Sequence, residues 1–199
     1  MKIFDISTPL SKTEFAPLDT RPKLKRISSA ENGDPCTETV LYSSLQCGTY
    51  IMSPSAFSED GTGKTVDSYE LSELEGPCEV IQAPGGPLTG AAAEHILPKF
   101  TDRVLIRSGG DFSMLKGTAE DISRAGYRLI GIEGRHFSSQ QQDDIYIKSV
   151  LSGSGTLLLL GLDLSHVTPG SYFLSCAPVS IEGTEAAFCR AMLFVNEKS

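Results

Sequence analysis

The 199-residue sequence lacks long hydrophobic runs, and no stretch approaches the roughly 20 apolar residues that a membrane-spanning helix needs. The first ten residues lack the apolar segment of a secretory signal peptide, so we expect no export. Basic runs are also missing, and the net charge is −8, which argues against a nucleic-acid-binding protein. These absences predict a soluble protein that binds neither membranes nor nucleic acids.

Disulfide and zinc-finger patterns are missing too. The chain has five cysteines, an odd number, at widely scattered positions: Cys36, Cys47, Cys78, Cys176 and Cys189. No two of them form a C-x-x-C pair. Reduced thiols are the simplest explanation of this scatter, and they predict a cytoplasmic location.

The composition that is present is typical of one globular domain, over residues 1–199, with 40% hydrophobic and 21% charged residues. The predicted strands are 2–6, 23–30, 37–46, 78–83, 102–108, 127–132, 157–160, 171–178 and 187–194. The predicted helices are 90–97, capped by Thr89, and 117–126, capped by Thr118 and ended by Gly126, while 145–152 is helical or irregular. Strands outnumber helices and helical patterns lie between some of them, which favours an α/β (α+β) fold.

One stretch, residues 45–67, is unusually dense in small polar and turn-forming residues. Gly48 would let the backbone approach a neighbour closely, and Pro54 fixes φ and removes a hydrogen-bond donor. The stretch follows a predicted strand, and sites in α/β folds tend to lie where a loop leaves a strand end. By composition alone it is equally compatible with an ordinary surface loop.

The stretch resembles the signature of the cyclase family that includes bacterial kynurenine formamidase, isatin hydrolase and polyketide cyclases. That signature reads H-x-G-T-H-x-D-x-P-x-H, followed by a phenylalanine and a Gly-Lys-Thr-(Val/Ile)-Asp run. The matching residues here are Gly48, Thr49, Pro54, Phe57, Lys64, Thr65, Val66 and Asp67. Further similarity covers 72–81, 126–134, 161–174 and 177–193. The resemblance implies a mixed, partly barrel-like sheet flanked by helices, in a homodimer or homotetramer.

The metal ligands of the family are absent from this sequence. Its three histidines and aspartate, which hold Zn²⁺ or Mn²⁺, are replaced by Gln46, Tyr50, Met52 and Ala56. An ungapped placement puts Lys148 and Leu160 where the family has a later histidine and glutamate. Amide, phenol, thioether and methyl groups cannot replace an imidazole and carboxylate cluster. We therefore expect no metal and no other cofactor.

Tyr50, His136 and Gln46 are the candidate catalytic residues. The Tyr50 hydroxyl could donate a proton or hold an oxyanion, or its ring could simply fill the space of the metal. His136 could act as a general acid or base, or be a solvated loop histidine. Gln46 could orient a carbonyl group.

Six further residues are candidates for substrate binding: Cys47, Ser53, Ser55, Phe57, Glu133 and Arg135. Glu133 matches an aspartate of the family that faces its site, and Arg135 is a departure from the family pattern. Cys47 could be a nucleophile, although most free cysteines are buried and inert. Ser53 and Ser55 have turn-forming roles as their default.

Three functions remain open at this point. The first is a metal-independent enzyme that acts on a small carbonyl-containing metabolite by cyclisation, dehydration, isomerisation, or lactone or amide chemistry, in natural-product biosynthesis. The second is a non-catalytic relative that binds a ligand or stabilises a partner. The third is a metal-dependent amide or lactone hydrolase with a relocated ion. A fold alone does not decide among them.

Overall fold

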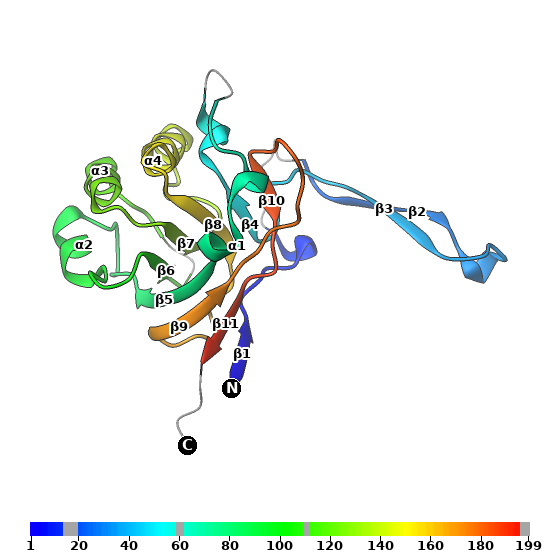
Figure 1. Cartoon of the computed structure of the whole chain (residues 1–199), viewed down its shortest axis with the longest axis horizontal. Coiled ribbons are helices and arrows are strands. Elements are labelled where there is room, and N and C mark those ends of the chain that lie inside the picture. The colour runs from blue at the N-terminus through cyan, green and yellow to red at the C-terminus, as the bar shows by residue number, and fades with distance from the viewer. Residues whose placement is uncertain (14–19, 59–61, 110–111, 196–199) are drawn as a thin grey trace.

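A nine-stranded mixed sheet curls into a half-barrel and organises the protein (Figure 1). The computed structural model describes residues 1–13, 20–58, 62–109 and 112–195. The strands lie in the order β1-β11-β9-β5-β6-β7-β8-β4-β10. Their bounds are β1 (Lys2–Asp5), β4 (Tyr50–Met52), β5 (Glu75–Gln82), β6 (Arg103–Arg107), β7 (Leu129–Glu133), β8 (Leu157–Leu162), β9 (Gly170–Ser175), β10 (Ala186–Phe188) and β11 (Met192–Val195).

The centre of the sheet is built from helical crossovers. Strands β5 to β8 are parallel, and α2 (Gly90–Ile96), α3 (Lys116–Ala125) and α4 (Gln141–Gly153) connect them on the outer face (Figure 1). Short helical turns occupy the remaining connections: η1 (Leu10–Lys12), η2 (Ala30–Asn32), η3 (Pro54–Phe57), η4 (Val66–Ser68) and α1 (Leu71–Leu74). None of the helices in the described residues has the length and apolarity to cross a membrane. The architecture confirms the predicted α/β (α+β) fold with a partly barrel-like sheet.

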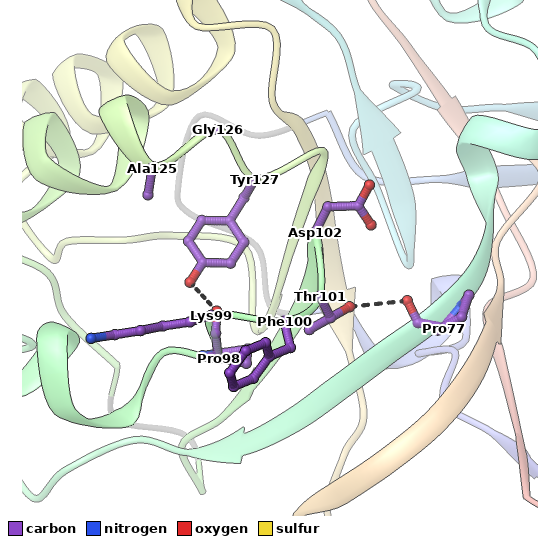
Figure 2. A pocket seen from close by; sticks show the side chains of 9 residues that line it. All are labelled: Pro77, Pro98, Lys99, Phe100, Thr101, Asp102, Ala125, Gly126 and Tyr127. Atoms are coloured by element: carbon purple, nitrogen blue, oxygen red, sulfur yellow. Dashed lines mark hydrogen bonds between the residues drawn. The ribbon is translucent and has the colours of Figure 1, made fainter.

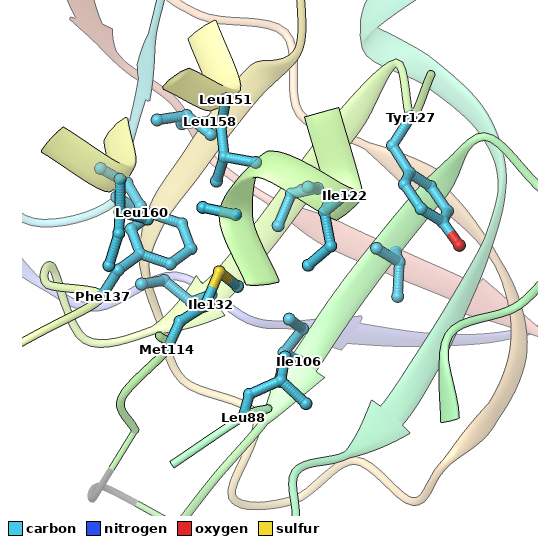
Figure 3. Close-up of a cluster of buried hydrophobic side chains, with 14 of the residues drawn as sticks. Leu88, Ile106, Met114, Ile122, Tyr127, Ile132, Phe137, Leu151, Leu158 and Leu160 are labelled. Atoms are coloured by element: carbon cyan, nitrogen blue, oxygen red, sulfur yellow. The ribbon is translucent and has the colours of Figure 1, made fainter. Parts of the chain in front are cut away.

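Two hydrophobic cores lie on the two faces of the sheet. Strand β8 contributes to both, because side chains alternate between the faces of a strand. Leu158 and Leu160 point to the helices, into the core shown in Figure 3. Leu157 and Leu159 point into the curl of the sheet. This double burial explains the run of four leucines.

Strands β2 (Lys23–Ser28) and β3 (Glu38–Tyr42) form a separate two-stranded hairpin that projects from the body (Figure 1). The sequence predicted two strands here, at 23–30 and 37–46, but the second was expected to run into the signature. It ends at Tyr42 instead. The alternating pattern of the hairpin is the same as that of a sheet strand, so the sequence does not reveal that it stands alone.

Several boundaries differ from the predictions for physical reasons. The predicted strand 187–194 is two strands, because β10 pairs with β4 whereas β11 pairs with β9 and β1. The residues 145–152 belong to the longer helix α4. Thr89 caps α2 as predicted, accepting a hydrogen bond from the Ala92 amide, and Gly126 ends α3 in the left-handed conformation. Thr118 is no cap: its hydroxyl donates to the Leu88 carbonyl.

Candidate functional site

The signature stretch enters the sheet as strand β4, between β8 and β10. Tyr50 lies opposite Leu160 in the pairing with β8, and Met52 lies opposite Leu158. The fold therefore brings together Tyr50, Met52 and Leu160, three of the residues that the sequence comparison expects at ligand positions of the family.

Gly48 and Thr49 of the signature stabilise the pairing of β4 with β8. The Thr49 hydroxyl donates to the Gly161 carbonyl at 2.5 Å and accepts from the Thr8 amide at 2.8 Å. Gly161 has φ +75°, and a Cβ there would lie 2.0 Å from the Gly48 carbonyl oxygen. Only glycine allows so close an approach. Gly48 and Thr49 thus have a structural role that does not depend on a metal.

Four of the side chains expected at ligand positions, those of Tyr50, Met52, Ala56 and Leu160, pack in one largely apolar cluster. Tyr50 is 1% exposed, and it packs with Met52 and Leu160 in the core on the helix side, with Ala56 and Phe57 against its edge. Thioether, methyl and leucine groups do not fit a site for Zn²⁺ or Mn²⁺, which prefers imidazole and carboxylate ligands. Across the described ranges, no group of three or more His, Cys, Asp or Glu side chains is placed to hold a metal ion. The donor set therefore does not fit the family metal.

The other candidates in the signature are held by local contacts. Gln46 donates its side-chain amide to Glu185 at 3.3 Å. The Ser53 hydroxyl lies 2.9 Å from that of Ser55 and donates to the Glu185 carbonyl. Cys47 is buried, with Sγ 3.7 Å from the Thr13 hydroxyl. These contacts build turns around β4, in line with the default roles of the two serines.

A second group of polar side chains lies beyond the carboxyl end of β7. His136 Nδ1 is 2.9 Å from Asp144 Oδ2, and the Lys148 ammonium donates to the same oxygen at 2.7 Å. Asp144 Oδ1 accepts from the Phe137 amide at 2.6 Å. Asp144 and Lys148 are buried on α4, whereas the His136 side chain is 55% exposed. The arrangement orients an accessible imidazole with a buried carboxylate.

The electrostatics of this group follow from its burial. Burial alone would raise the pKa of Asp144, but the hydrogen bonds from His136 and Lys148, with that of the Phe137 amide, lower it below the usual value. Burial also dominates at Lys148 and lowers the pKa of the ammonium, although Asp144 opposes this effect. Asp144 is thus a carboxylate that stays ionised and can hold one imidazole tautomer.

Glu133 and Arg135 lie at the same edge of the sheet. Glu133 accepts from the amides of Ser108 and Gly109, at 2.5 and 2.6 Å, and from the Leu164 amide at 3.2 Å. It therefore joins the loops that follow β6 and β8. Arg135 is half-buried and near enough to Lys148 to lower the pKa of that ammonium. This edge, where the parallel strands end, is the usual position of sites in α/β sheets.

Asp144 is the residue that the sequence analysis missed. It precedes Lys148 by four positions, the spacing at which side chains meet on a helix. That spacing was the available signal, but the predicted helical or irregular segment began only at residue 145.

A surface cavity of 600 Å³ lies at the opposite end of the sheet (Figure 2). Its walls come from the segments that precede β6 and β7, where Tyr127 donates its hydroxyl to the Pro98 carbonyl at 2.6 Å. None of the predicted site residues lines it. The cavity is lined by Pro77, Pro98, Lys99, Phe100, Thr101, Asp102, Ala125, Gly126 and Tyr127.

Comparison with known proteins extends the likeness over nearly the whole chain. No family model matches. The kynurenine formamidase of Erythrobacter litoralis is 28% identical over 205 residues, which cover 96% of this chain and 93% of that protein. Cyclase-like protein 1 of Arabidopsis thaliana is 26% identical, over 96% of this chain and 84% of its own.

Solved structures share the fold. A predicted metal-dependent hydrolase from Bacillus stearothermophilus superposes with a TM-score of 0.80 at 23% identity, covering 96% of this chain and 97% of that one. Isatin hydrolase A from Labrenzia aggregata, bound to benzyl benzoate, has a TM-score of 0.78 at 17% identity, covering 98% and 94%. Together with the signature frame around β4, these likenesses make the chain similar to proteins of the cyclase family over nearly its whole length.

Proposed function

We propose that this protein is a hydrolase-like enzyme that acts on a small carbonyl-containing metabolite, with side-chain acid and base groups in place of the family metal. The observation that carries the proposal is the contact between His136 and Asp144. It lies at the edge of the sheet where α/β enzymes bind their substrates. Relatives named as a formamidase and an isatin hydrolase support the substrate class.

His136 is the proposed general acid–base. Asp144 accepts a hydrogen bond from the Nδ1–H group, and this tautomer leaves Nε2 as the basic nitrogen of the neutral ring. Nε2 would take a proton from an attacking water, or from a nucleophile of the substrate itself, and return it to the leaving group. Attack by water gives hydrolysis, and attack by a nucleophile of the substrate itself gives cyclisation. Dehydration or isomerisation would use the same proton transfer through Nε2.

The Arg135 guanidinium would bind the charge that develops on a carbonyl oxygen, and the buried Lys148 ammonium would add to the positive potential there. Arg135 lies on the neighbouring position of the chain, and Lys148 shares Asp144 with the imidazole. Cations placed where negative charge develops stabilise a transition state. The burial of Tyr50 favours a packing role for its ring over a role as acid.

Turnover of isatin and of a kynurenine formamide, the compounds suggested by the relatives' names, tests this proposal. In His136→Ala we expect kcat to fall by roughly 10²- to 10⁴-fold, the usual contribution of a general acid–base. His166→Ala is the matched control, because His166 is an exposed histidine that the proposed site does not include, and it should keep full activity. A His136→Ala enzyme as active as the wild type would contradict the proposal.

A non-catalytic role is the alternative, and one observation favours it. Tyr50, Met52 and Leu160, which the resemblance assigns to ligand positions, pack together in the helix-side core. A site that has lost its catalytic activity would bind a ligand without changing it. Thermal stabilisation by a compound that mass spectrometry recovers unaltered after long incubation would support this alternative, whereas turnover of that compound would end it.

A further inference from the structure

The 600 Å³ cavity before β6 and β7 has walls that are fixed by contacts within the chain (Figure 2). The Tyr127 hydroxyl donates to the Pro98 carbonyl at 2.6 Å. The Thr101 hydroxyl donates to the Pro77 carbonyl at 3.3 Å. These hydrogen bonds tie the loop before β6 to strand β5 and to the segment before β7. Sites for small molecules are typically preformed in this way and measure about 300–1,000 Å³.

The apolar part of the cavity consists of flat groups. Phe100 lines it and is fully exposed, and Pro77 and Pro98 contribute their pyrrolidine rings. The Tyr127 ring lies behind them and is 8% exposed. Aromatic rings pack on one another offset or edge to face, and each apolar surface removed from water stabilises a complex. The walls therefore favour a ligand with an aromatic ring.

Cations outnumber carboxylates around the cavity. Lys99 lines it and is exposed, and no carboxylate of the described residues pairs with its ammonium group. Asp102 is the one carboxylate in the lining, and Arg103 and Arg128 hold its two oxygens at 2.8 and 2.9 Å. Burial raises the pKa of the Tyr127 phenol, which therefore adds no negative charge near neutral pH. Lys99 remains available to an anion, although the protein as a whole has a net charge of −8.

Two negative contributions near the cavity are smaller than this positive excess. Helix α3 ends at the cavity in Ala125 and Gly126, where the helix dipole places about half a negative charge. Glu73 is close enough to Arg128 for the guanidinium to lower its pKa, but its carboxylate is already paired with Lys64 at 3.1 Å. The cavity therefore favours an anionic ligand over a cationic one.

We propose that this cavity binds an aromatic carboxylate, whose ring packs against Phe100 and the two prolines while its carboxylate pairs with the Lys99 ammonium group. The flat apolar walls match the ring, and the ammonium group matches the charge. The cavity lies at the opposite end of the sheet from His136, and none of the proposed catalytic residues lines it. The inference goes beyond the proposed function and does not depend on it.

Fluorine NMR of the whole chain, with 4-fluorobenzoate as the probe, tests the proposal. We expect saturable binding with a Kd of about 1 mM or below, an affinity within the reach of a small ligand. Lys99→Met and Phe100→Ala should each raise this Kd at least about tenfold, because each removes one of the two recognised features. Methyl 4-fluorobenzoate keeps the ring but lacks the charge, and it should bind at least about tenfold more weakly than the acid.

Two control variants separate this site from other places where the probe could bind. Lys25→Met removes an exposed ammonium group from the β2–β3 hairpin, outside the cavity, and should leave the Kd unchanged. His136→Ala should also bind the probe as the wild type does, because the proposed catalytic group is not part of the cavity. Backbone amide shifts locate the probe directly, and the largest should fall within residues 98–102 and 125–127.

Binding that does not saturate by about 10 mM probe would overturn the proposal, since that affinity is too weak for a built site. An unchanged Kd in either Lys99→Met or Phe100→Ala would overturn it as well. Loss of binding in His136→Ala would place the probe in the proposed catalytic site and would likewise contradict the assignment to this cavity.

Discussion

Asp144 and Lys148 form a buried ion pair one turn apart on α4, with the ammonium nitrogen 2.7 Å from the carboxylate oxygen. Both side chains are less than a tenth exposed. The carboxylate has two other donors, His136 and the Phe137 amide, whereas Asp144 is the only partner observed for Lys148 among the described residues. Loss of the Asp144 carboxylate should therefore destabilise the protein more than loss of the Lys148 ammonium.

Removing the carboxylate should destabilise the protein strongly. Asp144→Asn leaves the buried Lys148 charge without compensation, and such a loss typically costs about 3–5 kcal/mol of unfolding free energy. Lys148→Met should cost less, because Asp144 keeps its other two donors. Urea denaturation measures the unfolding free energy of both variants.

The neighbouring residue supplies the control for this prediction. Asp143 pairs with Lys116 at 2.7 Å on the surface, where an ion pair contributes about 1 kcal/mol or less. Asp143→Asn should therefore have a small effect. Equal losses of unfolding free energy in Asp143→Asn and Asp144→Asn would show that the buried ion pair contributes no more to stability than the surface pair.

The donor chemistry at β4 predicts that the protein is independent of a bound metal. Protein purified without an affinity chelate should contain no stoichiometric Zn²⁺ or Mn²⁺, because Tyr50, Met52 and Ala56 offer no imidazole or carboxylate. Exhaustive chelation should leave the melting temperature unchanged. One ion per chain by elemental analysis would instead restore a metal-dependent hydrolysis of amides or lactones.

Buried thiols should limit stability at high pH. Burial raises the pKa of Cys78 and of Cys189 to about 12 from an ordinary value of 9.0. Between these values the unfolded chain has lost protons that the folded chain still holds, so stability falls as pH rises. Each thiol contributes about 1.4 kcal/mol of loss per pH unit in that range.

Alanine variants measure this contribution. Cys78→Ala and Cys189→Ala should each reduce the slope of unfolding free energy against pH above 9.0. Cys36→Ala is the control, because Cys36 is exposed in the β2–β3 hairpin. An unchanged slope in all three variants would contradict the prediction.

The parts of the fold that could be predicted are those with local signals. The strands that became β5 to β8 are apolar runs, and α2 and α3 have a capping threonine or a terminal glycine. Strand β4 was missed because its three residues lie among glycine, serine and proline. It is a strand through its pairing with β8 and β10, both of which follow far along the chain.

The candidate site was only partly predictable for the same reason. His136 was identified from the ability of imidazole to exchange protons, but its partner Asp144 lies on a helix whose first turns are polar. The side chains meet because the chain turns at Phe137, which inserts into the helix-side core. Glu133 was expected to bind substrate, and its hydrogen bonds to three backbone amides became visible only when the loops after β6 and β8 were placed beside it.

Three glycines allow a graded test of the contact between the signature and β8. At Gly161, with φ +75°, a Cβ would lie 2.0 Å from the backbone oxygen of Gly48, which cannot move without breaking the pairing of β4 and β8. At Gly131 a Cβ would meet the flexible end of Leu105 at 2.4 Å, and that side chain can shift. Gly117, in helix α3, has nothing within 4 Å of the added carbon.

The expected order of unfolding free energies follows from these neighbours. Gly161→Ala should abolish folding or cost more than about 3 kcal/mol, as strain and a backbone clash combine. Gly131→Ala should cost about 1–3 kcal/mol, the range for overpacking a core. Gly117→Ala should stabilise the protein by about 0.5–1 kcal/mol through helix propensity. A Gly161→Ala protein as stable as the wild type would mean that β4 and β8 do not approach as closely as the Gly-Thr frame requires.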